Sequence, residues 1–217
     1  MTAEFQYSPP TDPWLTIIHE DRDLLVVDKP SGLLSVPGRI HNDSALSRAL
    51  EKVPRAYACH RLDMDTSGLM IIALRRSAER EIKRQFRERL IRKTYIAVVW
   101  GQLPDDQGQI EAPLSRVAGP LPRSVVDHDN GRSAFTRYEV IARQADRTVL
   151  KLTPQTGRSH QLRVHMAELG HPIIGDRFYG DDSSPQDRLH LHAASLQFAH
   201  PYTGEPVVLN SKAPFAG

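Results

Sequence analysis

The segment HRLDMDTSGLMIIAL, residues 60–74, joins the densest group of polar side chains in the chain to an uninterrupted apolar run. Asp65 to Gly68 are typical of a turn, and the run from Leu69 to Leu74 favours a buried strand. A carboxylate on a loop at the end of a strand, beside cationic side chains, can serve as a nucleophile or a base. For Asp63 taken alone, a turn-forming or capping role is the commoner one, so the residue type does not decide between them.

A second polar group, TGRSHQLRVH at residues 156–165, stands where a helix is expected to begin. Helix N-termini attract anions, and Arg158 could add a charged fork there. Arg163 could pair with a carboxylate across a cleft. The alternative interpretation is a polar helix entrance with a structural ion pair, and the residues leave both open.

Short apolar runs recur along the chain, and most are bounded by Gly, Pro or Asp, a pattern typical of strands. They cover residues 14–18, 24–27, 69–74, 95–100, 135–141, 148–152, 189–198 and 206–209. Helices are expected over 44–50, over 77–90 with Ser77 as the cap, and from Ser159 to a C-terminal cap at Gly170. The connections are too short for βαβ units throughout, so we expect an α+β protein with a large mixed, mostly antiparallel sheet.

Two polar segments are expected to be loops. Ser115–Ser133 predicts a long loop or a hairpin tip, and Tyr179–Asp187 predicts a second loop. Neither has the length of a linker between independent domains. Any two halves of the molecule would therefore share one continuous sheet.

The composition is that of a folded globular protein, with 217 residues, 40% apolar and 25% charged. No run approaches the ~18 apolar residues of a membrane helix, and Met1–Pro13 lacks a secretion signal pattern. The single cysteine, Cys59, excludes an intrachain disulfide and the four-Cys and Cys2His2 zinc sites. A reducing cytoplasm is therefore the expected location.

Positive charge is concentrated between Arg75 and Lys93, where nine cations face three glutamates. Such a stretch attracts phosphates. It is also typical of a solvated helix face with pairs such as Glu79–Lys83. Charge alone does not separate these interpretations.

Metal and thiol chemistry find little support in the sequence. His190 and His192 are two apart on an expected strand and share a face, but a third ligand at suitable spacing is missing. Cys59 and His60 are adjacent in an extended segment and point to opposite sides, which favours a small buried thiol.

Residues 60–68 resemble the HRLDxxTSG motif of the RluA-type pseudouridine synthases, which carries the catalytic aspartate of that family. Four further blocks are similar to family blocks in the same order: VVDKPSGL (26–33), RKTYIAVVWG (92–101), GRSHQLRVHMAELGHPIIGDRFYG (157–180) and LHAASLQFAHPYTGE (191–205). The similarity runs from about Trp14 to Pro214. Pro9-Pro10, Pro13-Trp14-Leu15 and Ser35–Arg39 resemble the compact member of the family, which acts on both tRNA and 23S rRNA.

The resemblance implies the pseudouridine synthase catalytic fold, with flanking helices and loops around a central active-site cleft. It implies an N-terminal extension over residues 1–13, a single catalytic domain over 14–217 and no S4-like RNA-binding domain. The implied activity is the isomerisation of specific uridines in RNA to pseudouridine, in a tRNA anticodon stem-loop and a 23S rRNA hairpin. No cofactor and no metal are expected, and we expect a cytoplasmic monomer with RNA as its partner.

The resemblance also implies site residues. Asp63 matches the essential carboxylate, which attacks C1′ or the uracil ring or assists elimination at the sugar. Arg163 matches the arginine that pairs with it, and Tyr95 the tyrosine that stacks on the target base. Arg61 would occupy the place of the flipped-out uridine, and Leu191 would line the uracil pocket.

Two rival functions stay open at this point. One is an RNA-binding or RNA-folding protein that uses the same scaffold without catalysis. The other is a metal-dependent hydrolase built on the histidines with Asp63 and Asp65. The first predicts that the loss of Asp63 leaves activity intact, and the second predicts sensitivity to chelators.

Overall fold

The structure is a computed structural model that describes residues 7–119, 123–180 and 188–215. The strands are β1 Thr16–Glu20, β2 Leu24–Lys29, β3 Tyr57–Ala58, β4 Ser67–Ala73, β5 Arg92–Trp100, β6 Gln107–Glu111, β7 Leu114–Val117, β8 Arg123–Val126, β9 Phe135–Arg143, β10 Arg147–Pro154, β11 Leu191–Ala199 and β12 Pro206–Asn210. The helices are α1 Ala45–Leu50, α2 Arg76–Arg87 and α3 Gln161–Glu168. No helix in these ranges combines the length and the apolar character needed to cross a membrane.

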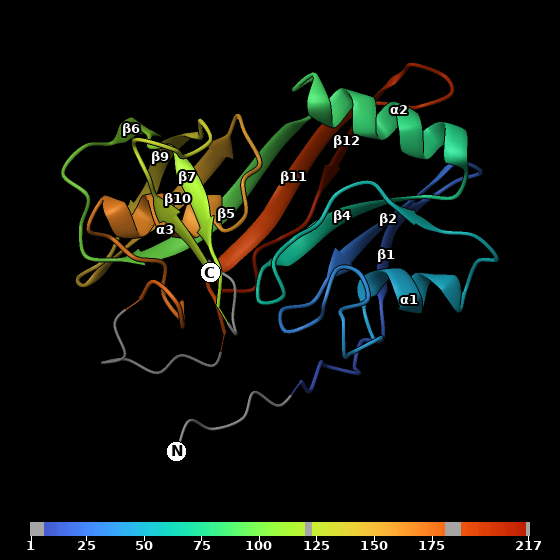
Figure 1. The fold of residues 1–217 in the computed structure, drawn as a ribbon, viewed down its shortest axis with the longest axis horizontal. Coiled ribbons are helices and arrows are strands. Elements are labelled where there is room, and N and C mark those ends of the chain that lie inside the picture. The colour runs from blue at the N-terminus through green and yellow to red at the C-terminus, as the bar shows by residue number, and fades with distance from the viewer. Residues whose placement is uncertain (1–6, 120–122, 181–187, 216–217) are drawn as a thin grey trace.

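One ten-stranded sheet runs through the molecule in the order β1-β2-β4-β11-β5-β10-β9-β6, with β12 beside β11 and β3 beside β4 (Figure 1). All its pairs are antiparallel except β4 with β11, where only His192↔Ser67 and Ala193↔Gly68 pair. The expectation of an α+β protein with a mixed, mostly antiparallel sheet is confirmed.

The half of the sheet that contains β2 and β4 is buried on both faces. Alternate residues of these strands pack on α1, which supplies Ala45 and Ala49, while the others pack on α2, which supplies Ala78 and Ile82. Figure 1 shows α1 and α2 on opposite sides of these strands. Double burial explains why β4 is a continuous apolar run rather than an alternating one. In the other half, α3 packs on β5 and β10.

The short parallel seam between β4 and β11 is reinforced by a chain of buried side chains. His192 Nδ1 lies 2.8 Å from Ser67 Oγ, and His192 Nε2 lies 2.9 Å from Ser211 Oγ. Ser211 in turn donates to Asp28 on β2. Gly68 has φ +111°, and a Cβ there would lie 2.4 Å from the carbonyl oxygen of Ala193. The close approach of β11 therefore requires glycine at the end of the HRLDMDTSG motif.

The helix prediction needs one correction. Ser77 does not cap α2, because the helix begins at Arg76 and Arg75 stands at the cap without a side-chain hydrogen bond. The position of α2 is set instead by the burial of Ala78 and Ile82 on the sheet. Glu79 in the first turn supplies the negative charge that a helix N-terminus favours.

The two expected loops have different outcomes. Within 115–133 the chain forms the hairpin of β7 and β8, so the hairpin interpretation is the correct one for the described part. The loop expected at 179–187 lies mostly outside the described residues. Strand β6 was not anticipated, because it is a polar edge strand in which only Ile110 is buried.

The stability of the fold is expected to fall in mild acid, because several histidines are buried in the neutral form. Burial lowers the pKa of His60 to about 3 and also lowers the pKa of His165 and His192. The unfolded chain therefore binds more protons below its ordinary histidine pKa of about 6.5, and stability is lost as the pH falls through that value. Urea denaturation at pH 7 and pH 5.5 should show a loss of about 1 kcal/mol from His60 alone.

A matched pair of variants checks this pH dependence. His165→Asn should flatten the dependence of the urea midpoint on pH, since His165 is fully buried. His128→Asn, which changes an exposed side chain, should leave the dependence as it is. Equal midpoints for the unchanged protein at pH 7 and pH 5.5 would contradict the argument.

Candidate active site

Asp63 lies in the loop between β3 and β4, at the end of the sheet where the parallel seam begins. Its side chain is 26% exposed, and its Oδ2 lies 3.4 Å from Nη1 of Arg163 on α3. A carboxylate that is reachable from solvent thus faces a cation that is only 3% exposed. The pairing of Arg163 with a carboxylate, expected from the sequence, is present in the structure.

The loop that carries Asp63 is held by side chains of residues 29–35, which donate hydrogen bonds to backbone carbonyls of the loop. The ammonium of Lys29 donates to the carbonyl of Met64 at 2.8 Å, and Ser31 donates to the carbonyl of Asp65 at 2.6 Å. Ser35 Oγ donates to the carbonyl of Leu62 at 2.7 Å. Burial lowers the pKa of Lys29 to about 7, although Asp65 and Asp63 oppose the shift. Three hydrogen bonds therefore place the carboxylate from both sides of the loop.

Arg163 is itself fixed by a buried carboxylate that the sequence analysis did not single out. Its Nε and Nη2 each donate to Asp176 at 2.7 Å, and the Asp176 side chain is 0% exposed. Burial disfavours the charged guanidinium, but Asp176 and Asp63 more than offset this and raise the pKa of Arg163. Two of its nitrogens hold the fork in place, and the third is left for Asp63.

His160 is a further residue at Asp63 that the sequence analysis did not assign to the site. Its Nε2 lies 4.0 Å from Asp63 Oδ1, and its Nδ1 lies 2.8 Å from the hydroxyl of Tyr179. Both residues lie in the block 157–180. A single sequence does not show that this block lies next to Asp63 in space.

Tyr95 and Leu191 come together on neighbouring strands. In the pairing of β5 with β11, Ala193 faces Tyr95 and Leu191 faces Ala97, and Tyr95 packs against the core cluster that contains Leu191. Burial and then the charge of Asp63 raise the pKa of Tyr95, so its hydroxyl is neutral at physiological pH. Leu191 is 3% exposed and lies in the core in this state.

Arg61 stands apart from this group. Its side chain is exposed, and no hydrogen bond or ion pair of Arg61 occurs among the described residues. It lies on the solvent side of the same loop, two residues before Asp63. The structure thus gathers Asp63, Arg163 and Tyr95 and leaves Arg61 free to meet a ligand.

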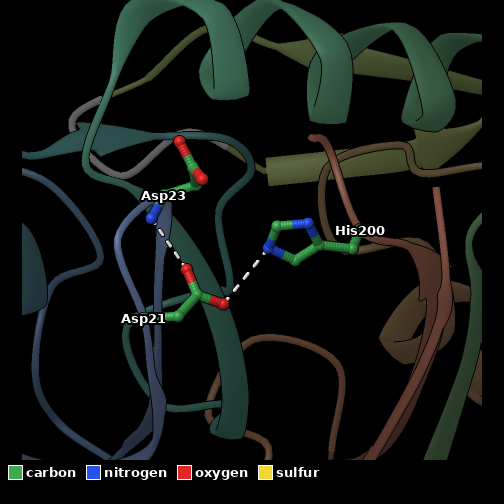
Figure 2. Close-up of side chains that lie close together, drawn as sticks. All are labelled: Asp21, Asp23 and His200. Atoms are coloured by element: carbon green, nitrogen blue, oxygen red, sulfur yellow. Dashed lines mark hydrogen bonds and ion pairs between the residues drawn. The ribbon is translucent and has the colours of Figure 1, made fainter. Parts of the chain in front are cut away.

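In the part of the chain that the structure describes, neither Asp63 nor Asp65 belongs to a group of three side chains with metal-ligand spacing. Among the described residues, the one group with metal-ligand spacing is Asp21, Asp23 and His200 (Figure 2). Asp21 and Asp23 lie just before β2, and His200 follows β11. Asp21 Oδ1 accepts the backbone N–H groups of Asp23 and Leu24 at 2.7 and 2.8 Å, and Oδ2 faces His200 Nε2 at 3.2 Å. These atoms already have partners, as Figure 2 shows for two of the contacts.

The chain is similar to known proteins over nearly its whole length. The family model described as RNA pseudouridylate synthase matches residues 23–168. A "Dual-specificity RNA pseudouridine synthase RluA" of Haemophilus influenzae is 50% identical over 221 residues, covering 98% of this chain and 100% of the relative. The protein of the same name in Escherichia coli K12 is 48% identical over 214 residues, covering 96% and 98%.

Solved structures agree with these matches. Human RNA Pseudouridylate Synthase Domain Containing 1 superimposes with a TM-score of 0.82 at 29% identity, covering 96% of this chain and 87% of that chain. Human RNA Pseudouridylate Synthase Domain Containing 4 gives a TM-score of 0.75 at 27% identity, covering 92% and 89%. The fold that positions Asp63 is thus shared with these solved structures.

Proposed function

Because the chain belongs to the RNA pseudouridylate synthase family, we propose that it modifies uridines in both tRNA and 23S rRNA, with Asp63 as its catalytic carboxylate. The chain is an isomerase that converts uridine in RNA to pseudouridine. The double substrate is supported by relatives named as dual-specificity enzymes, which this chain matches over nearly their whole length. An anticodon stem-loop and an rRNA hairpin are the proposed targets, met in the cytoplasm by a monomer.

The reaction breaks the bond between N1 of uracil and C1′ of ribose and forms a bond between C5 and C1′. The proton on C5 leaves, and N1 gains one, so no electrons are exchanged with a partner. A carboxylate can assist by bonding to C1′, by adding to the ring or by removing a sugar proton. Each route requires Asp63 in its ionised form.

The observation that carries the proposal is the contact between Asp63 Oδ2 and Arg163 Nη1 at 3.4 Å. The guanidinium donates toward the carboxylate and so limits the directions in which Asp63 can point. Arg163 is locked on Asp176, so it can hold this position without a substrate. The site thus presents an oriented carboxylate before RNA arrives, which reduces the reorganisation that the reaction requires.

The remaining site residues fit the handling of an extruded nucleotide. Tyr95 presents a neutral aromatic ring beside Asp63, suited to stacking on uracil. Arg61 is exposed two residues away and can fill the gap that the uridine leaves in the RNA. Leu191 supplies apolar wall next to Tyr95.

The test is the release of tritium from [5-³H]uridine-labelled tRNA and 23S rRNA, measured without added metal. Release from both RNAs, with pseudouridine identified in the digested product, is the expected result. Release from tRNA alone or rRNA alone would reduce the proposal to one substrate. Metal-dependent cleavage of the RNA without tritium release would return the hydrolase class to consideration.

Phosphate contacts are proposed for a basic patch beside the site, made of Arg89, Arg132 and Arg158. Arg158 donates to the carbonyl of Ser133 at 3.0 Å, and burial followed by the charges of Arg132 and Arg89 lowers its pKa. No ion pair of these three side chains occurs among the residues described. Arg158 is two residues from His160, so the patch adjoins the carboxylate.

Much of the helix charge expected to meet RNA is neutralised within α2. Lys83 pairs with Glu79 at 2.6 Å, as one of the two interpretations predicted, and Arg76 pairs with the same carboxylate at 2.8 Å. Arg84 pairs with Glu81 at 2.7 Å and also with Glu88. The patch, rather than the face of α2, is therefore the stronger attraction for phosphate.

Arg132→Gln is expected to weaken RNA binding and to lower the slope of log K against log salt by about 0.7 to 1, since one phosphate contact is lost. The single-turnover rate at saturating protein should stay unchanged. Arg84→Gln is the matched control, because Arg84 is already paired. Equal slopes for the two variants in filter binding across salt concentrations would count against the patch.

A further inference from the structure

His160 has a backbone conformation that its surroundings must maintain. Its φ is 54° and its ψ 18°, in the left-handed region, at the residue before α3. A non-glycine residue in this region costs on the order of 1 kcal/mol, and such residues persist where neighbouring contacts hold them. Here the ring stacks on Phe178 with centroids 5.8 Å apart and planes 17° apart. The strain places the imidazole against Asp63 rather than in solvent.

A chain of hydrogen bonds favours one tautomer of His160 over the other. The backbone N–H of Ser124 on β8 donates to the hydroxyl of Tyr179 at 2.8 Å. The hydroxyl proton of Tyr179 is then free to donate to His160 Nδ1, 2.8 Å away. This direction makes Nδ1 the acceptor and places the proton of the neutral ring on Nε2, which faces Asp63 Oδ1 at 4.0 Å.

The ring is neutral under physiological conditions. Burial is the largest influence that lowers the pKa of His160, and Arg163 and Arg116 act in the same direction. Asp63 and Asp176 oppose the shift without reversing it. These four charged groups, with the Tyr179 hydroxyl, surround the imidazole from α3, β7, the loop before β4 and the segment after α3. A neutral donor, not a second cation, thus faces the carboxylate.

We propose that His160 is a positioning residue for Asp63: its Nε2–H orients Oδ1 while Arg163 orients Oδ2, and Tyr179 transmits the position of hairpin β7–β8 to the carboxylate. The inference rests on the proposed role of Asp63. At 4.0 Å the contact is longer than a hydrogen bond, and a shift of about 1 Å would close it. Catalytic hydrogen bonds are commonly long before substrate binds and tighten in the complex.

This arrangement gives the hairpin a path to the chemistry. Arg123 of β8 lies over the ring of Phe178 at 5.0 Å, and Ser124 holds Tyr179. RNA binding that displaces the β7–β8 hairpin therefore also displaces Phe178 and Tyr179, and His160 moves with them. When the correct RNA binds, the His160 donor would join the Arg163 donor at Asp63. Recognition of the RNA would then raise the rate of the chemical step as well as the affinity.

Tyr179→Phe tests the relay with the smallest change, because it removes the hydroxyl and keeps the ring. The single-turnover rate at saturating protein should fall about tenfold, the effect of one lost hydrogen bond, while the Kd for RNA stays within about twofold. Tyr202→Phe is the matched control, since Tyr202 is 81% exposed. A normal rate for Tyr179→Phe would overturn the relay.

The tautomer is read directly by ¹⁵N NMR of histidine-labelled protein at neutral pH. His160 should show a protonated Nε2 and an unprotonated Nδ1, a signature that a merely structural role would not require. A protonated Nδ1 in the unchanged protein would overturn the proposal. His160→Gly, which keeps the left-handed backbone, removes the resonance and assigns it.

Rescue by a conservative variant completes the test. His160→Gln places an amide N–H near the position of the imidazole Nε2–H, so it should restore part of the rate that His160→Gly loses. Equal rates for the two would overturn the role of the donor. If Asp63→Asn were fully active, the proposed function itself would fail. If Asp63→Asn is inactive while the His160 variants are normal, only this inference fails.

Discussion

Asp63→Asn is expected to lower tritium release from labelled RNA by at least about 10³-fold, with RNA affinity unchanged. Asparagine has nearly the same shape and can still accept a hydrogen bond from Arg163, 3.4 Å from Oδ2. It cannot bond to C1′, add to the ring or remove a proton as a carboxylate does. Single-turnover release and filter binding on the same preparations separate the chemical step from binding.

Asp65→Asn is the matched control for this variant, because Asp65 is a carboxylate in the same loop two residues away. It should retain activity close to that of the unchanged protein, and both variants should melt at similar temperatures. If Asp63→Asn released tritium as fast as Asp65→Asn, Asp63 would not be the catalytic carboxylate. If the unchanged protein released none while binding RNA tightly, the RNA-binding or folding protein on the same scaffold would be the better description.

Arg163→Met is expected to destabilise the fold by about 3–5 kcal/mol and to reduce the rate strongly. The large cost arises because Asp176, whose side chain is 0% exposed, would lose both hydrogen bonds of the guanidinium and stay buried as a lone charge. Asp63 would lose the ion pair that orients it. Urea denaturation measures the first effect, and single-turnover release in native buffer measures the second.

The two effects of Arg163 can be separated by removing its structural partner as well. Arg163→Met combined with Asp176→Leu takes away the unpaired buried charge, so most of the lost stability should return. The rate should stay low, because Asp63 still lacks its cation. Recovery of the rate together with stability would show that Arg163 acts only through the fold. Arg163→Lys keeps the charge but not the fork, so an intermediate result is expected.

Much of the fold could be predicted from local pattern. The apolar runs at 24–27, 69–74 and 148–152 form β2, β4 and β10. A strand that is covered on both faces needs a continuous run of apolar side chains, and a strand covered on one face needs an alternating pattern. Ser44, expected in a short helix, caps α1 because its hydroxyl oxygen accepts a hydrogen bond from the backbone N–H of Ser47. The prediction that Ser77 caps α2 was wrong, because the packing of Ala78 and Ile82 on the sheet outweighed the local capping preference of serine. Strand β6 escaped notice because an edge strand buries few side chains.

The amino-acid sequence by itself determined the fold class, the motif that carries Asp63 and, through family blocks in a common order, the chemistry. The tertiary structure alone decided which side chains complete the site. Asp63 and Arg163 are 100 residues apart, and Asp176 and Tyr179 are unremarkable in sequence. They meet because the β4–β11 seam and the packing of α3 on β5 and β10 bring both halves of the sheet to one point. Local sequence encodes periodicity and turns, whereas a buried ion pair depends on the simultaneous packing of distant elements.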